Sequence, residues 1–352
     1  MTDRNSAQAR RPDTSGLRLL ILAGFFVVLS GLGFWAVYSQ FAGENLTFDD
    51  RLLNASTLAS VCALLCIYFA ADGLRLYYTL RALGQAVALS TIFRLVFINI
   101  FFSNITPMAT GGGFAQIWFL QRHGVRIGTA TAATTIRTVL AMIFIFTLTP
   151  FFLLTLEELD NQALIGEISG LLAVLIILYL GFFGVVLLRT RWLIAPLSVL
   201  LQAARKAHLI SSSRHKRWQF KARREMVRFA RSFSLYAHGP RGDVLLSVFF
   251  TAVFLLSLFS FPALLIHSLG YDTDYLISLG LLVVTTFVMY FAPTPGASGI
   301  SEGVFGSFFS GILSPAHLVV VTIVWRVLTI YLGMLVGLVV TQLELSRGRS
   351  AK

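Results

Sequence analysis

A six-residue pattern that occurs twice holds the residues best suited to form a site inside apolar sequence. Residues 106–111 read Thr-Pro-Met-Ala-Thr-Gly and residues 294–299 read Thr-Pro-Gly-Ala-Ser-Gly, so both follow T-P-x-x-[ST]-G. Proline removes a helix hydrogen bond and glycine loosens the backbone, so each copy is expected to break a helix at membrane depth. Broken helices at corresponding places in two halves of a membrane protein are typical of a transporter binding site.

An acidic residue follows the second copy directly, in Gly299-Ile300-Ser301-Glu302. A carboxylate at the centre of a membrane span costs on the order of 3 kcal/mol on insertion, so Glu302 should face protein or water and have a partner. Arg137 and Arg326 lie well inside apolar spans, which makes both of them natural partners. A functional gate and a structural lock between two helices are both compatible with such a pair.

Neutral polar side chains surround the first break: Asn99, Asn104, Thr106, Thr110 and Gln116. Beside Pro107, the run Gly111, Gly112 and Gly113 leaves backbone N–H groups that could converge on an anion, although close helix packing explains the run equally well. Asn104, Thr106 and the three glycines are expected to form one wall of a polar groove. The opposite wall is assigned to the second break: Pro293, Pro295, Gly296 and Gly299.

Charged residues also close the second apolar run, at Asp72, Arg75 and Arg81. Arg75 and Arg81 could meet lipid phosphates at the membrane interface, and side chains that merely snorkel to the interface are the simpler interpretation. Cys62 and Cys66 lie four residues apart without acidic or histidine partners, which favours packing over a metal or redox pair.

The usual sequence patterns of catalysis are missing. The chain contains no H-x-x-x-H, C-x-x-C, G-x-S-x-G or Walker-type sequence. We therefore expect no catalytic residue, no metal site and no cofactor, and a protein that is not an enzyme. Without a sequence for an ATP-binding module, transport would be driven by a gradient, by exchange or by nothing.

Composition defines the class of protein. Apolar residues make up 56% of the 352 residues and charged residues 12%, about half the charged fraction of soluble domains. Runs long enough to cross a hydrocarbon layer of roughly 30 Å predict spans at 17–38, 55–71, 131–154, 171–188, 244–266, 275–292 and 316–341. Two interrupted apolar regions, 87–118 and 293–313, contain the repeated pattern. The first span is expected to be an uncleaved signal anchor.

The charges predict an orientation. Residues 189–243 hold thirteen Lys and Arg against two acids, whereas the connections 39–56, 155–170 and 267–275 carry nine acids and one base. The positive-inside rule then places both termini and the 189–243 loop in the cytoplasm. Both ends inside require an even number of crossings. We therefore predict eight crossings, with 293–313 as a broken crossing and 87–118 as a re-entrant hairpin.

The basic loop 189–243 needs a separate interpretation. Between Arg214 and Phe233, apolar residues recur at helical spacing among Arg and Lys, a pattern that favours an amphipathic helix on the anionic inner leaflet. A charge cluster that only sets the topology fits the same pattern. Nucleic acid is not an expected partner, because no nucleic-acid-binding motif accompanies the charge.

At these residues the chain resembles the flippase-like membrane proteins related to the transmembrane part of lysylphosphatidylglycerol synthase, the multiple peptide resistance factor. The resemblance covers about residues 17–341. It is carried by the stretch from Arg75 through Arg81 to Gly84, by Asn104, Pro107 and Gly111–Gly113, by Arg137, by Pro293-Thr294-Pro295-Gly296-Ala297-Ser298-Gly299-Ile300-Ser301-Glu302, and by Arg326. The family often has an acid after its early glycine cluster, where this chain has Phe114 and Ala115. Since a short tail alone follows residue 341, the resemblance implies lipid translocation without lipid synthesis.

The combined prediction is an all-α polytopic protein of the bacterial-type inner membrane. It comprises a cytoplasmic tail at 1–16, a transmembrane domain at 17–341 and a cytoplasmic tail at 342–352, and its two breaks meet near the midplane as inverted repeats. The expected function is the flipping of a phospholipid or a polyprenyl-linked or other polar-headgroup lipid, with Glu302 and Arg137 or Arg326 as the gate or a proton-coupled switch. Two alternatives remain: a membrane scaffold for a lipid- or glycan-synthesising enzyme, and an intramembrane lipid-modifying transferase.

Overall fold

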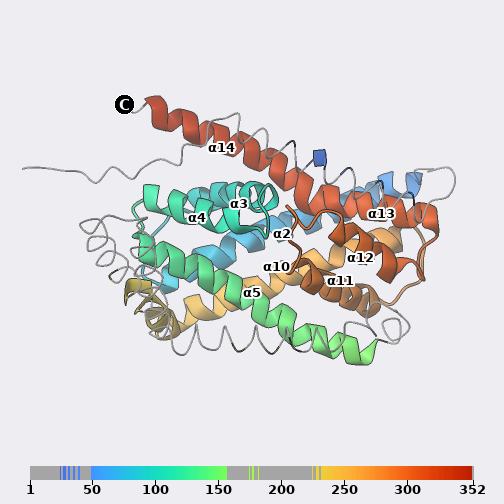
Figure 1. The fold of residues 1–352 in the computed structure, drawn as a ribbon, viewed down its shortest axis with the longest axis horizontal. Coiled ribbons are helices and arrows are strands. Elements are labelled where there is room, and N and C mark those ends of the chain that lie inside the picture. The colour runs from blue at the N-terminus through green and yellow to red at the C-terminus, as the bar shows by residue number, and fades with distance from the viewer. Residues whose placement is uncertain are drawn as a thin grey trace, which may run out of the picture.

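The described part of the chain is helical and contains no strand. A computed structural model describes residues 49–156 and 231–350, together with isolated residues at 24–39, 174–181 and 224–229. The expected spans 17–38 and 171–188 and most of the basic loop lie outside it. The elements, coloured along the chain in Figure 1, are η1 (Asp50–Leu53), α2 (Ala55–Ala82), α3 (Leu89–Asn104), α4 (Thr110–Arg122), α5 (Ile127–Thr155), α10 (Arg241–Ser268), α11 (Tyr275–Met289), α12 (Ile300–Phe309), α13 (Pro315–Arg326), the π-helical η3 (Val327–Tyr331) and α14 (Leu332–Ser350).

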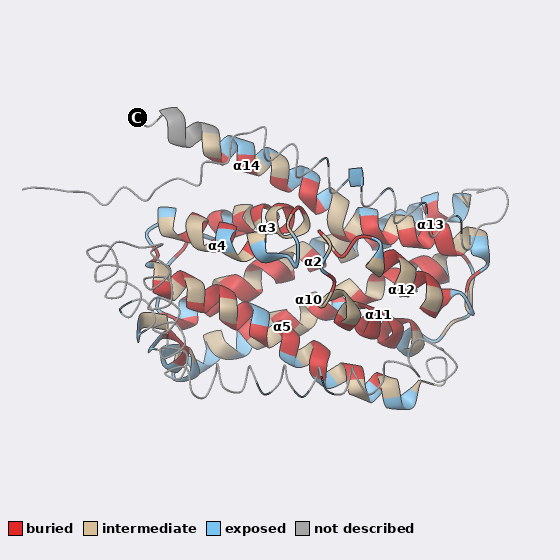
Figure 2. Cartoon of the chain, viewed as in Figure 1, coloured by how far each residue is buried: buried red, intermediate tan, exposed pale blue. Residues whose placement is uncertain are grey.

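Four helical segments among the described residues are long and apolar enough to cross a membrane. They are α2, α5, α10 and the continuous helix Pro315–Leu345, with 28, 29, 28 and 31 residues. At 1.5 Å per residue, 28 residues extend about 42 Å, more than the roughly 30 Å hydrocarbon layer. Their outward faces remain apolar, as at Leu58, Phe249 and Leu335, which are 45%, 57% and 65% exposed. Such surfaces suit lipid, while the buried residues form the interior shown in red in Figure 2.

Helices α2 and α10 pack antiparallel and form the largest helix–helix contact. Near one end, Arg81 Nε lies 3.3 Å from Asp243 Oδ1. At the other end, Arg51 Nη1 donates to the carbonyl of Leu269, just past α10, at 2.6 Å. Between these ties the ring of Tyr68 stacks on Phe254, with centroids 5.1 Å apart. The two helices therefore lie side by side along their length and are tied to each other near both ends.

The described residues of two acidic connections, 39–56 and 267–275, lie together at the end where α2 begins. Asp49 Oδ2 lies 3.3 Å from His317 Nε2, and the Tyr271 hydroxyl lies 2.8 Å from His317 Nδ1. Hydrogen bonds from Arg51 to Asp49 hold the pKa of that carboxyl below its usual value. The starts of α2 and α13 and the end of α10 therefore meet here. The ends of α2 and α4 and the starts of α5 and α10 carry the opposite sign: Arg81, Arg122, Arg126 and Arg241.

The first interrupted region is a pair of half-length antiparallel helices. Helices α3 and α4 pack against each other, and the turn at 105–109 joins them. The contacts pair Asn99 with Gln116 and Ser103 with Gly112, so the two helices run in opposite directions. With 16 and 13 residues, they reach about 24 and 20 Å, short of a full crossing. This is the geometry that a re-entrant hairpin at 87–118 requires.

The second interrupted region differs from its prediction. The segment 275–292 was expected to cross fully and 293–313 to follow as a broken crossing. Instead α11 has 15 residues and α12 has 10, and the two pack against each other around a turn at 290–299. Pro293 and Pro295 lack the N–H needed to continue α11, which explains the early end. Figure 1 shows α11–α12 reaching the middle from the end opposite to α3–α4.

This correction lowers the predicted number of crossings without changing its parity. A hairpin that replaces two crossings removes both, so the number stays even. Both termini on one side of the membrane therefore remains a consistent prediction. The count of eight crossings does not agree with the helices seen at 275–313.

Close helix packing predicts a sensitive glycine. In α14, a Cβ on Gly337 would overlap the backbone oxygen of Phe97 in α3 and come within 2.8 Å of Phe101 Cβ. Because backbone cannot move aside, Gly337→Ala should lower the free energy of unfolding by about 1–3 kcal/mol. Equilibrium unfolding of the purified protein in mixed micelles measures this. Gly242→Ala is the control, since a Cβ there meets nothing within 4 Å. Equal stability of both variants would contradict the α3–α14 packing.

Candidate functional site

The two copies of the repeated pattern fold into the same turn. Their third and fourth residues all have left-handed backbone angles: φ is 53° at Met108 and Ala109, 58° at Gly296 and 56° at Ala297. In both copies the amide of the fourth residue donates to the carbonyl of the first, at 3.3 Å in the first copy and 3.1 Å in the second. The equivalence therefore extends from sequence to local backbone structure. An inverted repeat of whole halves remains a prediction.

The turns also touch each other. Pro107 and Pro295 form an isolated antiparallel β-bridge, although 188 residues of sequence separate them. Each turn lies between two half-length helices, so this contact joins the inner tips of the two hairpins, near the middle of the view in Figure 1. Residues 107–110 of the first turn are exposed, whereas Pro295, Ala297 and Ser298 of the second are buried.

Glu302 pairs with Arg326, and both side chains are fully buried. Arg326 Nε lies 2.9 Å from Glu302 Oε1 without the alignment of a hydrogen bond. The other carboxylate oxygen accepts from the Gly299 amide at 2.7 Å and from the Ser301 hydroxyl at 2.8 Å, which caps the start of α12. A helix N-terminus and a guanidinium both interact favourably with a carboxylate. A buried charge is thus neutralised where the second break begins.

Arg326 also holds the second turn. Its Nη2 donates to the Gly296 carbonyl at 2.9 Å and lies 3.5 Å from the Ser298 hydroxyl. The π-helical segment η3 begins at the next residue, Val327. Single π-helical turns within α-helices are frequent at functional sites, because they re-aim side chains and loosen the helix locally. One guanidinium therefore connects α13, α12 and the turn.

Arg137 does not reach Glu302, contrary to one of the two expected pairings. It contacts Asp72 through Nη2 and donates from Nη1 to Gln116 Oε1 at 2.9 Å. Arg75, one helical turn from Asp72, donates from Nε to the same carboxylate oxygen at 2.7 Å. The guanidinium of Arg75 also lies 3.7 Å from the ring centre of Phe254.

This cluster corrects the expectation for Arg75. Asp72, Arg75 and Arg137 are 2%, 7% and 4% exposed, so Arg75 is not an interfacial anchor. The reason is that α2 continues to Ala82, eleven residues beyond the end of the predicted span at 71. Asp72 and Arg75 therefore lie within the helix, where charged groups need partners.

A line of polar contacts leads from this cluster to the first hairpin. Gln116 Nε2 donates to Asn99 Oδ1 at 2.6 Å, and the Ser103 hydroxyl donates to the same oxygen at 3.3 Å. A Cβ on Gly112 would overlap Ser103, whereas one on Gly113 would meet nothing within 4 Å. Close packing of α4 on α3 therefore explains Gly112, as the alternative interpretation of the glycine run held.

The remaining predicted site residues lie at the two turns. Thr106 accepts from the Gly111 amide at 2.8 Å and donates to the Phe102 carbonyl at 2.7 Å, while Asn104 donates to the Ile100 carbonyl at 2.8 Å. These bonds satisfy backbone groups that the helix break leaves free. Pro293 and Gly299 are exposed, and Gly299 has a φ of 85° that favours glycine.

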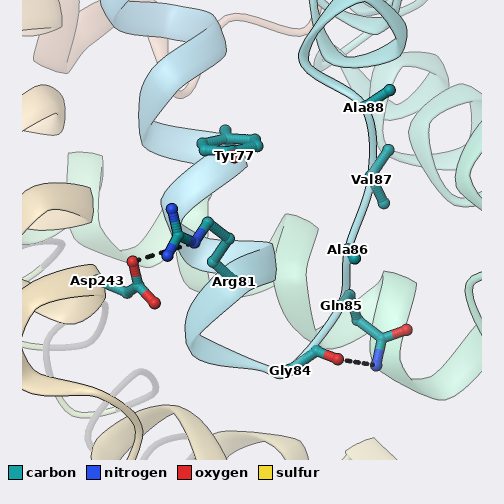
Figure 3. A pocket seen from close by; sticks show the side chains of 8 residues that line it. All are labelled: Tyr77, Arg81, Gly84, Gln85, Ala86, Val87, Ala88 and Asp243. Carbon is teal, nitrogen blue, oxygen red and sulfur yellow. Dashed lines mark hydrogen bonds and ion pairs between the residues drawn. The ribbon is translucent and has the colours of Figure 1, made fainter.

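Arg81 lies elsewhere, at the basic end. It lines a cavity of about 490 Å³ together with Tyr77, Asp243 and the extended segment 84–88. In Figure 3 its guanidinium points to Asp243 on one side of this cavity, and Gln85 lies opposite. The structure thus separates Arg81 from Arg75, which sequence analysis treated together as interface residues.

Sequence analysis missed Asp72 and Gln116 as partners of Arg137. An i, i+3 spacing places Asp72 and Arg75 on one face of a helix, and that signal could have identified the pair. A second signal is that Arg137 and Arg326 follow the last glycine of their respective patterns at nearly the same distance, 26 and 27 residues. Within the described residues, no group of three or more His, Cys, Asp or Glu could hold a metal ion.

Comparison with known proteins adds two similarities. The family model described as "Lysylphosphatidylglycerol synthase TM region" matches residues 16–337. The chain is also 24% identical over 332 residues to a protein of Archaeoglobus fulgidus named "UPF0104 membrane protein", and the alignment covers 92% of this chain and 98% of that one. The matched region contains both turns and all the buried charged residues described above.

The buried Glu302–Arg326 pair predicts non-additive mutations. Removing one partner leaves an uncompensated buried charge, so Glu302→Gln or Arg326→Gln alone should lower the free energy of unfolding by about 3–5 kcal/mol. The double variant removes both charges and should lose clearly less than the sum. Equilibrium unfolding in mixed micelles measures all three, with the exposed Asp50→Asn as a control. Additive losses would show that the two side chains do not interact.

Proposed function

The chain belongs to the family of the lysylphosphatidylglycerol synthase TM region, and from that premise we propose that it translocates a polar-headgroup lipid between membrane leaflets. The substrate would be a phospholipid or a polyprenyl-linked lipid. Its headgroup would pass between the two hairpin turns while its apolar tails stay in the bilayer. The membrane is proposed to be the inner membrane of a bacterial-type cell, with both termini in the cytoplasm.

The contact between the two turns is the observation that carries this proposal. Irregular backbone is tolerated at membrane depth where it is buried in protein or lines a water-filled cavity. Here two broken segments meet at Pro107 and Pro295, and buried charged clusters flank them on both sides. Hairpins that enter from opposite ends and meet at their tips are suited to a path that opens alternately to either side.

Glu302 and Arg326 are proposed as the gate. Arg326 binds the carbonyl of Gly296, and Glu302 caps the helix that starts after the same turn. A charged headgroup that competes for either side chain would weaken both ties and free the turn. The same pair would serve as a gate or as a proton-coupled switch, the two roles expected from the sequence.

Two further partners are proposed, the anionic inner leaflet and a separate enzyme. The basic loop 189–243 would lie on the anionic inner leaflet and so keep the protein close to its substrate. A lipid- or glycan-synthesising enzyme is the proposed supplier or consumer of that lipid. The chain itself is proposed to have no enzymatic activity and no cofactor.

Lipid translocation in proteoliposomes tests the proposal. Purified protein is reconstituted with headgroup-labelled lipids, with and without a proton gradient, and the label that reaches the outer leaflet is measured. Glu302→Gln and Arg326→Gln should each slow translocation by about tenfold or more, since a tenfold effect needs only 1.4 kcal/mol of lost interaction. Asp50→Asn and Arg241→Gln, exposed changes of the same charge, are the matched controls.

Three outcomes would contradict the proposal or a part of it. Translocation that is unaffected by both substitutions would exclude the gate. The scaffold alternative would be supported if no lipid were translocated and a synthase co-purified equally well with the wild type and with Glu302→Gln. Formation of a modified lipid in detergent would support the transferase alternative.

Locking the two turns together provides a second prediction. Met108 follows Pro107 and Thr294 precedes Pro295, so continuing the antiparallel register by one residue would place them opposite each other. Cysteines at both positions, in a Cys62→Ala and Cys66→Ala background, should form a disulfide on oxidation. Translocation should then stop and return on reduction. The Met108→Cys variant alone is the control, and full activity of the oxidised double variant would show that the turns need not separate.

A further inference from the structure

We propose that the buried cluster of Asp72, Arg75 and Arg137 binds the phosphate of the translocated headgroup. This inference rests on the proposed function and narrows it, because it assigns a phosphate-bearing anionic lipid as the substrate class. The site is distinct from the Glu302–Arg326 gate. It consists of side chains from α2 and α5, with Gln116 of α4 above it.

The first argument is the charge of the cluster. Within the described residues, the ion pairs of Arg75 and Arg137 both lead to one carboxylate, that of Asp72. Two guanidiniums and one carboxylate leave one positive charge in excess. All three side chains are more than nine-tenths buried, so water cannot screen that charge. An uncompensated buried charge is unfavourable, and a bound anion would neutralise it.

The second argument is unused hydrogen-bonding capacity. Among the residues that the structure describes, no hydrogen-bond partner faces Arg75 Nη1 or Arg137 Nε, and both atoms are buried. Both guanidiniums contact one oxygen, Asp72 Oδ1, and Arg137 also binds Gln116, so each guanidinium keeps one nitrogen whose donors these contacts do not use. Arginine forks match the planar, paired acceptor oxygens of phosphate better than any other side chain. An entering phosphate would accept from the unused nitrogen of each guanidinium.

The third argument compares the two halves of the molecule. Arg137 and Arg326 occupy nearly equivalent positions after their patterns, and each contacts a buried acid and a polar side chain of its hairpin. The pair in the second half is neutral, which is sufficient for a structural lock. Arg75 is the addition in the first half. Its guanidinium lies 3.7 Å from the ring centre of Phe254, so its position is fixed without a second acid.

A chain of hydrogen-bonded polar side chains leads from the first hairpin to the cluster. Asn99 and Ser103 on α3 are half-buried and lead through Gln116 to Arg137 by consecutive hydrogen bonds. Arg137 is ten residues into α5, about 15 Å along the helix, so the cluster lies well inside the bundle and not at its end. A headgroup that moves along this face would exchange amide contacts for guanidinium contacts.

Ligand-induced stabilisation tests the site without relying on transport. Purified protein in an uncharged detergent is titrated with phosphatidylglycerol, with a neutral diacylglycerol glycolipid and with inorganic phosphate, and the melting temperature is followed. We expect stabilisation by phosphatidylglycerol and none by the glycolipid. Arg75→Gln and Arg137→Gln should weaken the apparent affinity at least about tenfold, and Arg241→Gln, an exposed arginine, should leave it unchanged.

Two further variants separate binding from folding. Arg75→Lys keeps the charge and should retain part of the phosphatidylglycerol effect, even where Arg75→Gln folds poorly. Asp72→Asn removes the competing carboxylate. It should lower the melting temperature of the free protein, yet phosphatidylglycerol should raise that temperature more than it does in the wild type. A purely structural cluster predicts no such gain, so its absence would overturn the proposal.

The remaining outcomes distinguish the two proposals and the two sources of phosphate. Equal stabilisation by the neutral glycolipid would overturn the phosphate site. Inorganic phosphate that binds as tightly as the lipid would overturn the lipid assignment in favour of a free anion. Phosphatidylglycerol binding that depends on Arg75 and Arg137, in a protein that translocates no lipid, would support the site and refute the proposed function.

Discussion

A backbone N–H or C=O group without a partner costs several kcal/mol at membrane depth, and this constraint determines how the two broken segments can be arranged. Each break frees such groups around a proline. The described structure satisfies them within the turns, through Thr106 at the first break and through Arg326 at the second. It then places the turns against each other. The second turn is buried by this contact and by the helices around it, whereas residues 107–110 of the first turn stay exposed.

The same constraint applies to charge. Every charged side chain buried in the interior of the described residues lies within reach of an opposite charge, yet the two clusters are built differently. The one beside the second turn is neutral and includes a capped helix start. The one below the first hairpin has an arginine in excess. The two halves therefore have similar helices but clusters of different net charge. The neutral pair suits the proposed gate, and the positive cluster suits the proposed phosphate site.

Much of this arrangement could be predicted from sequence. Composition and run length indicated long apolar helices, and the repeated pattern located both breaks, because proline and glycine act on the backbone locally. The prediction that 275–292 crosses the membrane was wrong, because hydropathy measures apolar content and does not reveal where a chain turns back. Partner choice was the other gap. Nothing in the sequence separates Arg137 from Arg326 as partners of Glu302, because the pairing depends on which helices pack together.

Although the two turns have the same backbone conformation, their residues tolerate it unequally. Gly296 adopts a left-handed conformation freely, whereas Met108 at the matching position carries a Cβ that disfavours it by about 1–2 kcal/mol. The two turns therefore have the same backbone shape but differ in backbone strain. Opening the first turn, on the side of the basic end, would therefore relieve backbone strain at Met108, whereas opening the second would require Arg326 to release the Gly296 carbonyl.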